Sequence, residues 1–135
     1  MQHGLMASAD SWIINEESIS PAFRLAELGY DVWLGNQRGS KYSRRHEYLD
    51  PDKMEDLRYW DFSFEQMGDI DAPAQIDYIL EKTGQKKLTY LGHSQGTTQM
   101  FYGLATNEDY FKDKINSFIA LAPAVKLTRC STEAI

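Results

Sequence analysis

The sequence lacks several features that would direct it away from an ordinary folded domain. Its single cysteine, Cys130, cannot form a disulfide within the chain, so no covalent framework is expected. No apolar run reaches the roughly 18 residues of a membrane span, and the N-terminus lacks the basic and then apolar pattern of a signal peptide. The sequence therefore predicts no transmembrane segment and does not indicate a compartment.

Positive charge is also scarce. The 14 Lys and Arg residues are outnumbered by 20 Asp and Glu, which gives a formal net charge of -6. Nucleic-acid binding requires an excess of Lys and Arg on one face, so we expect no nucleic-acid partner. The one basic run, at residues 41–46, is short, and a solvated loop is favoured over a phosphate-binding or nuclear-localisation patch.

The chain has the length and composition of one folded domain. It has 135 residues, of which 42% are hydrophobic and 13% aromatic. Apolar runs alternate with helical patterns, which is typical of an α/β fold with a parallel sheet flanked by helices. The expected helices are residues 21–28 with Ser20 as N-cap, 63–84 with a capping box between Ser63 and Gln66, and 95–104.

Three strands are expected, at residues 30–34, 87–91 and 116–125, the last with the apolar content of a buried parallel strand. A long polar loop between the first strand and the long helix is expected either to be functional or to cover one edge of the sheet. The pattern looks cut at both ends: a His-Gly loop normally follows a strand, which here would precede Met1, and no helix follows the last strand. We therefore expect a single partial domain over residues 1–135.

The segment Gly92-His93-Ser94-Gln95-Gly96 fits G-x-S-x-G, placed between a strand and a helix. In this nucleophile elbow the serine hydroxyl points away from the sheet, and glycine is needed two positions to either side because a side chain there would collide with neighbouring backbone. Ser94 is thus the candidate nucleophile, with a plain glycine-rich turn as the alternative. We expect His93 to be a packed structural histidine.

An oxyanion is expected to bind two backbone amides. The amide of Gln95, at the start of the helix, is one candidate, and its position there adds the favourable end of the helix dipole. The second should come from a loop after an earlier strand, and residues 3–5 occupy that place in chain order, so Leu5 is the other candidate. Taken alone, the His-Gly pair is more typical of a simple turn.

Four segments closely resemble the acid lipase family of α/β-hydrolases, which includes the lysosomal acid and gastric lipases. They are QHGLMASADSWI, LAELGYDVWLGNQRGSKYSRRH, WDFSFEQMGDIDAPAQIDYILEKTGQKKLTYLGHSQGTT and FIALAPAV. The resemblance implies a partial α/β-hydrolase fold, hydrolysis of triacylglycerols, sterol esters or related lipid esters, and no metal or organic cofactor. It places the nucleophile on Ser94 and the oxyanion amides on Gln95 and Leu5, and it suggests a lysosomal or secreted parent.

The chain departs from this family in its catalytic base and acid. Both follow the serine in the α/β-hydrolase order, but the histidines here, His3, His46 and His93, all precede Ser94. The acids after Ser94 are expected to be surface charges; they are Glu108, Asp109, Asp113 and Glu133. Without an imidazole base the serine is a weak nucleophile, so we expect the 135-residue chain by itself to be inactive, with the lid and the C-terminal catalytic portion absent.

Three hypotheses remain open at this point. The favoured one is a fragment of a serine lipase or esterase. The second is a non-catalytic α/β-hydrolase remnant that acts as a binding or interaction module, with a partner chain covering exposed sheet edges. The third is a degraded or mispredicted gene product. Trp12, Trp33 and Trp60 are expected in the core rather than in an acyl groove. Arg38 is expected to form a structural ion pair or to clamp a carbonyl rather than to contact substrate.

Overall fold

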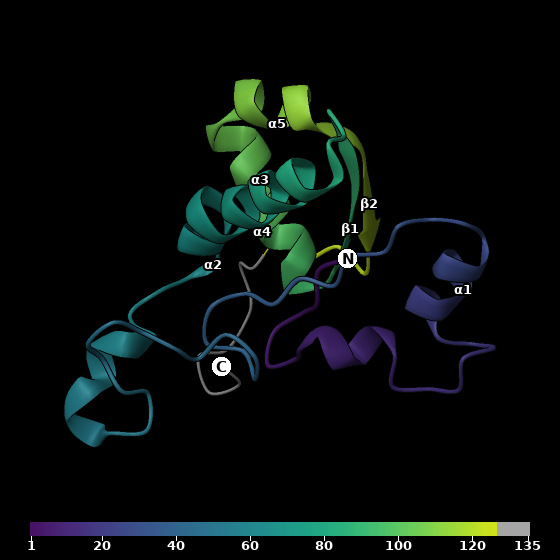
Figure 1. Ribbon diagram of the computed structural model, residues 1–135. Coiled ribbons are helices and arrows are strands. Elements are labelled where there is room, and N and C mark those ends of the chain that lie inside the picture. The colour runs from purple at the N-terminus through teal and green to yellow at the C-terminus, as the bar shows by residue number, and fades with distance from the viewer. Residues whose placement is uncertain (127–135) are drawn as a thin grey trace.

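Two parallel strands and three helices packed on one side of them form the centre of the computed structural model, which describes residues 1–126 (Figure 1). Cys130 and Glu133 lie outside the described residues. The elements, in chain order, are η1 (Ala9–Trp12), α1 (Pro21–Glu27), η2 (Met54–Trp60), α2 (Phe64–Gln66), the π-helix η3 (Met67–Asp71), α3 (Ala72–Thr83), β1 (Leu88–His93), α4 (Gln95–Thr106), α5 (Glu108–Lys114) and β2 (Ile115–Leu121).

The two strands pair in parallel from Leu88 opposite Ile115 to His93 opposite Leu121, with one irregularity after Leu88. The chain's first residues extend this layer on the other side of β1. Gln2 forms parallel bridges to both Gly92 and Gly35, its amide donates to the Leu91 carbonyl at 2.8 Å, and its carbonyl accepts from the His93 amide at 3.0 Å. The N-terminal segment is therefore held against the end of β1.

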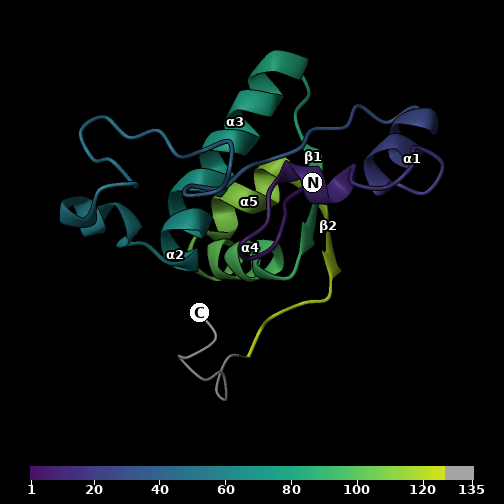
Figure 2. The ribbon, with the colours of Figure 1, turned by 90° about the horizontal axis from the view of Figure 1, so that it is seen from below.

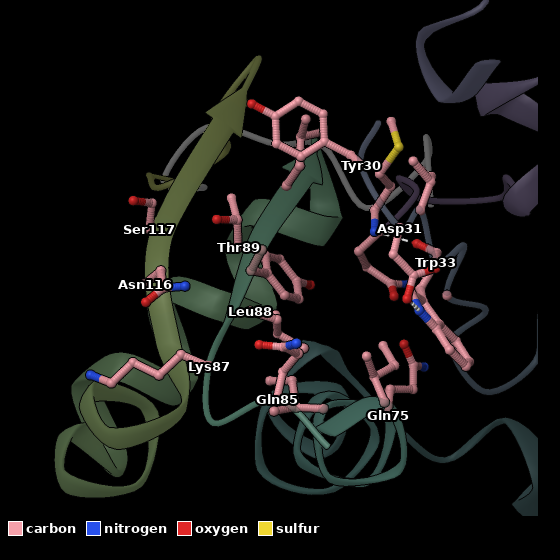
Figure 3. Close-up of a pocket in the computed structure, with 18 of the residues that line it drawn as sticks. Tyr30, Asp31, Trp33, Gln75, Gln85, Lys87, Leu88, Thr89, Asn116 and Ser117 are labelled. Atoms are coloured by element: carbon pink, nitrogen blue, oxygen red, sulfur yellow. Dashed lines mark hydrogen bonds between the residues drawn. The ribbon is translucent and has the colours of Figure 1, made fainter. Parts of the chain in front are cut away.

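The prediction of a strand at residues 30–34 is wrong. These residues form no regular strand, and only Gly35 makes an isolated bridge, to Gln2. A strand needs a partner along its length, but the backbone bonds of this stretch within residues 1–126 are few. The Tyr30 amide donates to the Leu25 carbonyl, the Trp33 carbonyl accepts from the Met1 ammonium, and the Gly35 amide donates to the Met1 carbonyl. Instead, a cavity of about 590 Å³ separates it from β1; Figure 3 shows Asp31 and Trp33 on one side of this space and Leu88 and Thr89 on the other.

The expected helices are present, with local differences. Pro21 begins α1 as predicted, but the Ser20 hydroxyl donates to the Asn15 carbonyl at 2.7 Å and does not cap the helix. The 63–84 pattern is confirmed as α2, η3 and α3 in succession, interrupted by the π-helical turn. Its capping box is present, since the Ser63 amide donates to Gln66 Oε1 at 2.8 Å, and Gly84 ends α3 with φ 67°.

The core lies between β1 and the helices α3, α4 and α5, which cover one face of the strands, while α1 lies on the other side (Figures 1 and 2). Its buried members are Ile76, Tyr90, Met100 and Phe111. The expectation that the last strand is buried is wrong: β2 is shorter than predicted, and Ile119 is 45% exposed because the helices cover one face only. Within residues 1–126, no helix is long and apolar enough to cross a membrane.

Candidate active site

Ser94 occupies the turn between β1 and α4 in a strained backbone conformation. Its φ of 51° and ψ of -119° are rare for a residue with a side chain, and strain of this kind is found mostly at functional sites. The turn is tied down on both sides: the Ser94 amide donates to the Leu121 carbonyl at 3.0 Å, and the Ser94 carbonyl accepts from the Thr97 amide at 2.8 Å. The serine is thus presented by a rigid strand-turn-helix unit.

The two glycines of the motif sit where a side chain has no room. A Cβ at Gly92 would lie 2.7 Å from the Gly96 carbonyl oxygen, and one at Gly96 would lie 2.6 Å from the Gln2 oxygen and 2.7 Å from the His3 oxygen. These distances are far below ordinary contact. The obstacle at Gly96 is the N-terminal segment of the chain, which the sequence motif alone does not identify.

The loop at residues 3–5 lies directly against this turn. A Cβ at Gly4 would be 3.0 Å from Ser94 Cβ and 3.3 Å from His93 Nδ1, so the two backbones touch. Among residues 1–126, the amides of Leu5 and Gln95 donate no hydrogen bond. Both amides are therefore available to an added acceptor. Leu5 follows Gly4 and Gln95 follows Ser94, the two residues that are in contact.

His3 is fully enclosed, with 1% of its surface exposed. Its Nδ1 lies 2.9 Å from the Gly4 carbonyl oxygen, which makes Nδ1 the protonated nitrogen, and its Nε2 accepts from the Gln37 amide at 3.4 Å. Burial lowers the pKa of His3, because the interior disfavours the charged ring; the bond to Gly4 opposes this shift only in part. His3 is therefore a neutral part of the loop's framework.

The other two histidines do not reach the serine either. The expectation that His93 is packed is wrong: its side chain is exposed. Its ring meets the edge of the Trp12 ring, at 6.4 Å between centroids, and its Nδ1 lies beside Gly4. Side chains alternate along β1, so His93 lies on the face opposite the buried Tyr90, away from the helices. His46 is used within the long loop, where its Nδ1 accepts from the amides of Tyr48 and Leu49. No side chain in the described part of the chain hydrogen-bonds to Ser94 Oγ.

A second cavity, also of about 590 Å³, opens beside the turn. Its lining is largely apolar and includes Leu5, Met6, Trp60, Phe62, Met67 and Gln95. Trp60 is 42% exposed, so the expectation of a core position fails for this residue. Trp12, by contrast, is buried as expected, and Trp33 lines the cavity between residues 30–33 and β1.

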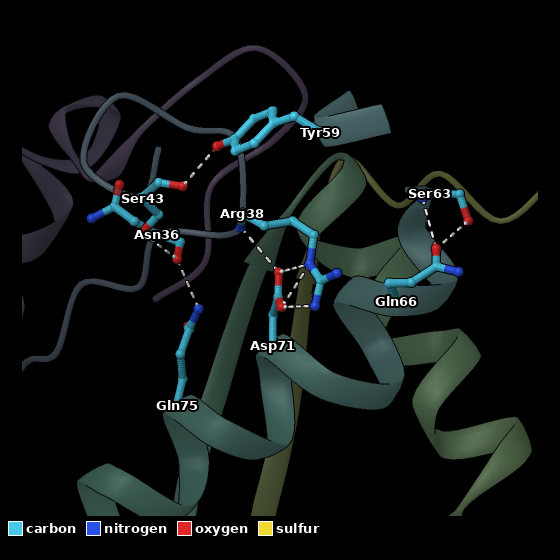
Figure 4. A network of polar contacts seen from close by, with 8 residues as sticks. All are labelled: Asn36, Arg38, Ser43, Tyr59, Ser63, Gln66, Asp71 and Gln75. Atoms are coloured by element: carbon cyan, nitrogen blue, oxygen red, sulfur yellow. Dashed lines mark hydrogen bonds and ion pairs between the residues drawn. The ribbon is translucent and has the colours of Figure 1, made fainter. Parts of the chain in front are cut away.

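Arg38 closes one side of this cavity through the ion pair that the sequence predicted. Its side chain binds Asp71 through two nitrogens, with Nη2 at 2.6 Å and Nε at 2.9 Å from Oδ1, and its amide donates to Oδ2 at 3.0 Å (Figure 4). In the same view Gln75 donates to the Asn36 carbonyl at 2.9 Å. These contacts anchor the start of the long loop to η3 and α3, so the cavity wall is fixed by backbone as well as by charge.

Comparisons with known proteins agree with this geometry. Residues 1–133 match the alpha/beta hydrolase fold family. The chain is 53% identical over 131 residues to a human gastric triacylglycerol lipase, covering 96% of this chain and 32% of the relative. It is 54% identical over 125 residues to human lipase member K (93% and 30%), and 46% identical over 123 residues to lipase lipl-3 of Caenorhabditis elegans (91% and 30%). The chain therefore spans about a third of the length of the curated relatives it matches.

Proposed function

The chain belongs to the alpha/beta hydrolase fold family, and from this membership we propose that it is the nucleophile-bearing segment of a serine hydrolase that cleaves lipid esters. The observation that carries the proposal is the strained Ser94 turn with the Gly4 backbone packed against it. This arrangement gathers a nucleophile and two unengaged amides at one place, as acyl transfer requires.

In the proposed reaction Ser94 Oγ attacks the ester carbonyl while its proton passes to the base, and a tetrahedral intermediate forms. The amides of Gln95 and Leu5 donate to the oxygen that becomes negative, and the N-terminus of α4 adds its dipole. The alcohol then leaves with a proton from the base. Water attacks the acyl-serine in the same way, giving a proton to the base, and the fatty acid is released as Ser94 Oγ takes that proton back. Because the negative charge develops only during reaction, these amides stabilise the transition state more than the bound ester.

We assign the base and the acid to sequence outside the described residues. Within the described residues, His3 has both ring nitrogens engaged, and neither His46 nor His93 hydrogen-bonds to the serine hydroxyl. About two thirds of the length of the first relative lies outside the part matched here. A histidine and an aspartate from such sequence complete the triad in this proposal, and the 135-residue chain alone lacks the proton acceptor that the reaction needs.

The substrate class follows from the cavity beside the turn and from the relatives' names. An apolar lining next to Leu5 and Gln95 suits an acyl chain, because transfer of methylene groups out of water is favourable by about 0.8 kcal/mol each. Two of the relatives are named as triacylglycerol lipase and lipase. We therefore propose a lipid ester, with the acyl chain against Trp60 and Phe62.

The test is labelling with a fluorophosphonate, which reacts only with an activated serine. It is applied to the 135-residue chain and to a longer protein that contains it, each compared with Ser94→Ala and with Ser117→Ala, which removes an exposed serine from β2 as a matched control. We expect the longer protein to label and to hydrolyse a long-chain ester, with both activities lost in Ser94→Ala and kept in Ser117→Ala. The 135-residue chain should remain unlabelled.

Labelling of the 135-residue chain at Ser94 would contradict the assignment of the base to other sequence and would direct attention to His93 and His46. Absence of labelling in both proteins, with folding verified by circular dichroism, would refute the hydrolase proposal. It would then favour the non-catalytic binding module as the function of this fold.

A further inference from the structure

Gln37 is a buried polar residue that contacts both sides of the candidate oxyanion site. It is 3% exposed, although it lies in the loop that follows Gly35. Its Nε2 donates to Gln95 Oε1 at 2.8 Å, and its Oε1 accepts from Gln2 Nε2 at 3.2 Å. Its backbone amide donates to His3 Nε2 at 3.4 Å. Gln37 thereby bonds to Gln95, which carries one candidate amide, and to His3 in the loop that carries the other, the amide of Leu5.

The directions of these bonds are mutually consistent. The side-chain amides of Gln2, Gln37 and Gln95 form a row. Gln2 donates to Gln37 and Gln37 donates to Gln95, so each NH₂ group donates to the oxygen of the next side chain. A buried amide without partners costs about 1–3 kcal/mol, so this row resists rotation of any member. The Gln95 side chain at the first position of α4 is therefore held in one orientation.

The same residue constrains the other amide through His3. The His3 ring accepts from Gln37 at Nε2 and donates from Nδ1 to the carbonyl of Gly4, the residue before Leu5. The ring is thereby fixed at both nitrogens, and it sets the direction of the Gly4–Leu5 peptide. No other described residue bonds to both His3 and Gln95.

Resting on the proposed function, we infer that Gln37 is a positioning residue that holds the amides of Leu5 and Gln95 in fixed relation for binding the oxyanion. It donates nothing to the reacting atoms. Loss of its side chain releases Gln95 directly and removes the acceptor of Gln2, the residue before His3, while the backbone bond from Gln37 to His3 remains. A displacement near 1 Å at a catalytic group can lower the rate by about 100-fold, so this support bears on turnover.

The experiment compares Gln37→Met with Gln99→Met in the longer protein that contains the chain and hydrolyses an ester through Ser94. Methionine has nearly the length of glutamine but no amide, so Gln37→Met removes both side-chain bonds and keeps the packing. Gln99 is a matched control because it is fully buried in α4 and donates to the Tyr90 hydroxyl at 2.9 Å. We expect Gln37→Met to lower kcat by about 10- to 100-fold with KM within about twofold, since oxyanion contacts act in the transition state.

Gln99→Met should lower the unfolding midpoint at least as much while kcat stays within about twofold. Equal losses of kcat in the two variants would overturn the inference, because the effect would then follow stability alone. Gln2→Met removes the Gln2–Gln37 bond and leaves the Gln37–Gln95 bond in place, so it should give a smaller loss of kcat than Gln37→Met. If Gln37→Met does not fold, Gln2→Met takes its place in the comparison with Gln99→Met.

A structural measurement separates this inference from the proposed function. In ¹⁵N-labelled 135-residue chain, Gln37→Met or Gln2→Met should shift the backbone amide resonances of Leu5 and Gln95, whereas Gln99→Met should not. If these resonances shift but no protein containing the chain shows Ser94-dependent hydrolysis, the proposed function fails and the coupling of the two amides stands. If hydrolysis depends on Ser94 and neither resonance shifts, the inference about Gln37 fails.

Discussion

Replacement of Gly96 by alanine tests the close approach that brings the N-terminal segment to the serine turn. An added Cβ would lie 2.6 Å from the Gln2 oxygen and 2.7 Å from the His3 oxygen, where ordinary contact begins at 3.4 Å. Two backbone carbonyls would thus have to retreat by about 0.7–0.8 Å. The Gln2 carbonyl already accepts from the His93 amide at 3.0 Å, so this retreat weakens the pairing with β1.

The expected magnitude follows from opposing effects. Alanine favours a helix over glycine by about 1 kcal/mol, which would stabilise α4. Overpacking typically costs about 1–3 kcal/mol, and each weakened backbone bond costs about 1 kcal/mol more. We therefore expect Gly96→Ala to lower the free energy of unfolding by about 2 kcal/mol, despite the better helix propensity.

The assay is urea unfolding of the 135-residue chain, followed by tryptophan fluorescence, because Trp12 is buried in the N-terminal segment. Gly103→Ala is the matched control in the same helix: its Cβ would meet the Phe111 ring at 2.7 Å, but the one backbone atom near it, the Gly68 oxygen, lies 3.2 Å away, so the backbone has to move much less. It should cost about 1 kcal/mol less. The reasoning is refuted if Gly96→Ala is as stable as the unsubstituted chain, or if the control loses more.

Two further outcomes are expected. A double-mutant cycle of Arg38→Met and Asp71→Asn, measured by urea unfolding, should give a coupling of about 1–2 kcal/mol, because the side chains are only 31% and 12% exposed and the pair is bidentate; a coupling near zero would place it among weak surface pairs. Burial lowers the pKa of His3 in the folded state, so its contribution to stability is fully present above the pKa of the unfolded chain, about 6.5, and is lost as the pH falls below it. The free energy of unfolding should therefore fall in acid. His3→Asn, which keeps a donor for the Gly4 carbonyl, should flatten this decline. An unchanged pH profile in that variant would contradict this account.

Local patterns in the sequence predicted most of the helices and the order of the elements. The capping box at Ser63 and Gln66 and the glycine at 84 mark the ends of the long helix, because caps depend on residues within one turn of each other. The α/β class and the family resemblance are confirmed. The π-helical turn at Met67–Asp71 has no such local signal, since it arises where the helix packs against α4.

Strands were predicted less well because a strand depends on its neighbours. Residues 30–34 have the composition of a strand, yet too little backbone lies beside them to form a ladder. Ile119 is apolar and was expected to be buried, but burial requires a covering layer on its own face. The position of His93 follows from the same cause, because alternation along β1 turns it to the uncovered face.

The sequence by itself determined the serine turn, since the strand, the flanking glycines and the following helix are contiguous and their sterics are local. Only the tertiary structure decided what lies against that turn. Gly4 meets Ser94, and Gln37 bonds to both His3 and Gln95, through contacts between segments far apart in the chain. Such contacts depend on how the chain packs as a whole, because a buried amide finds its partner in space and leaves no periodic mark in the sequence.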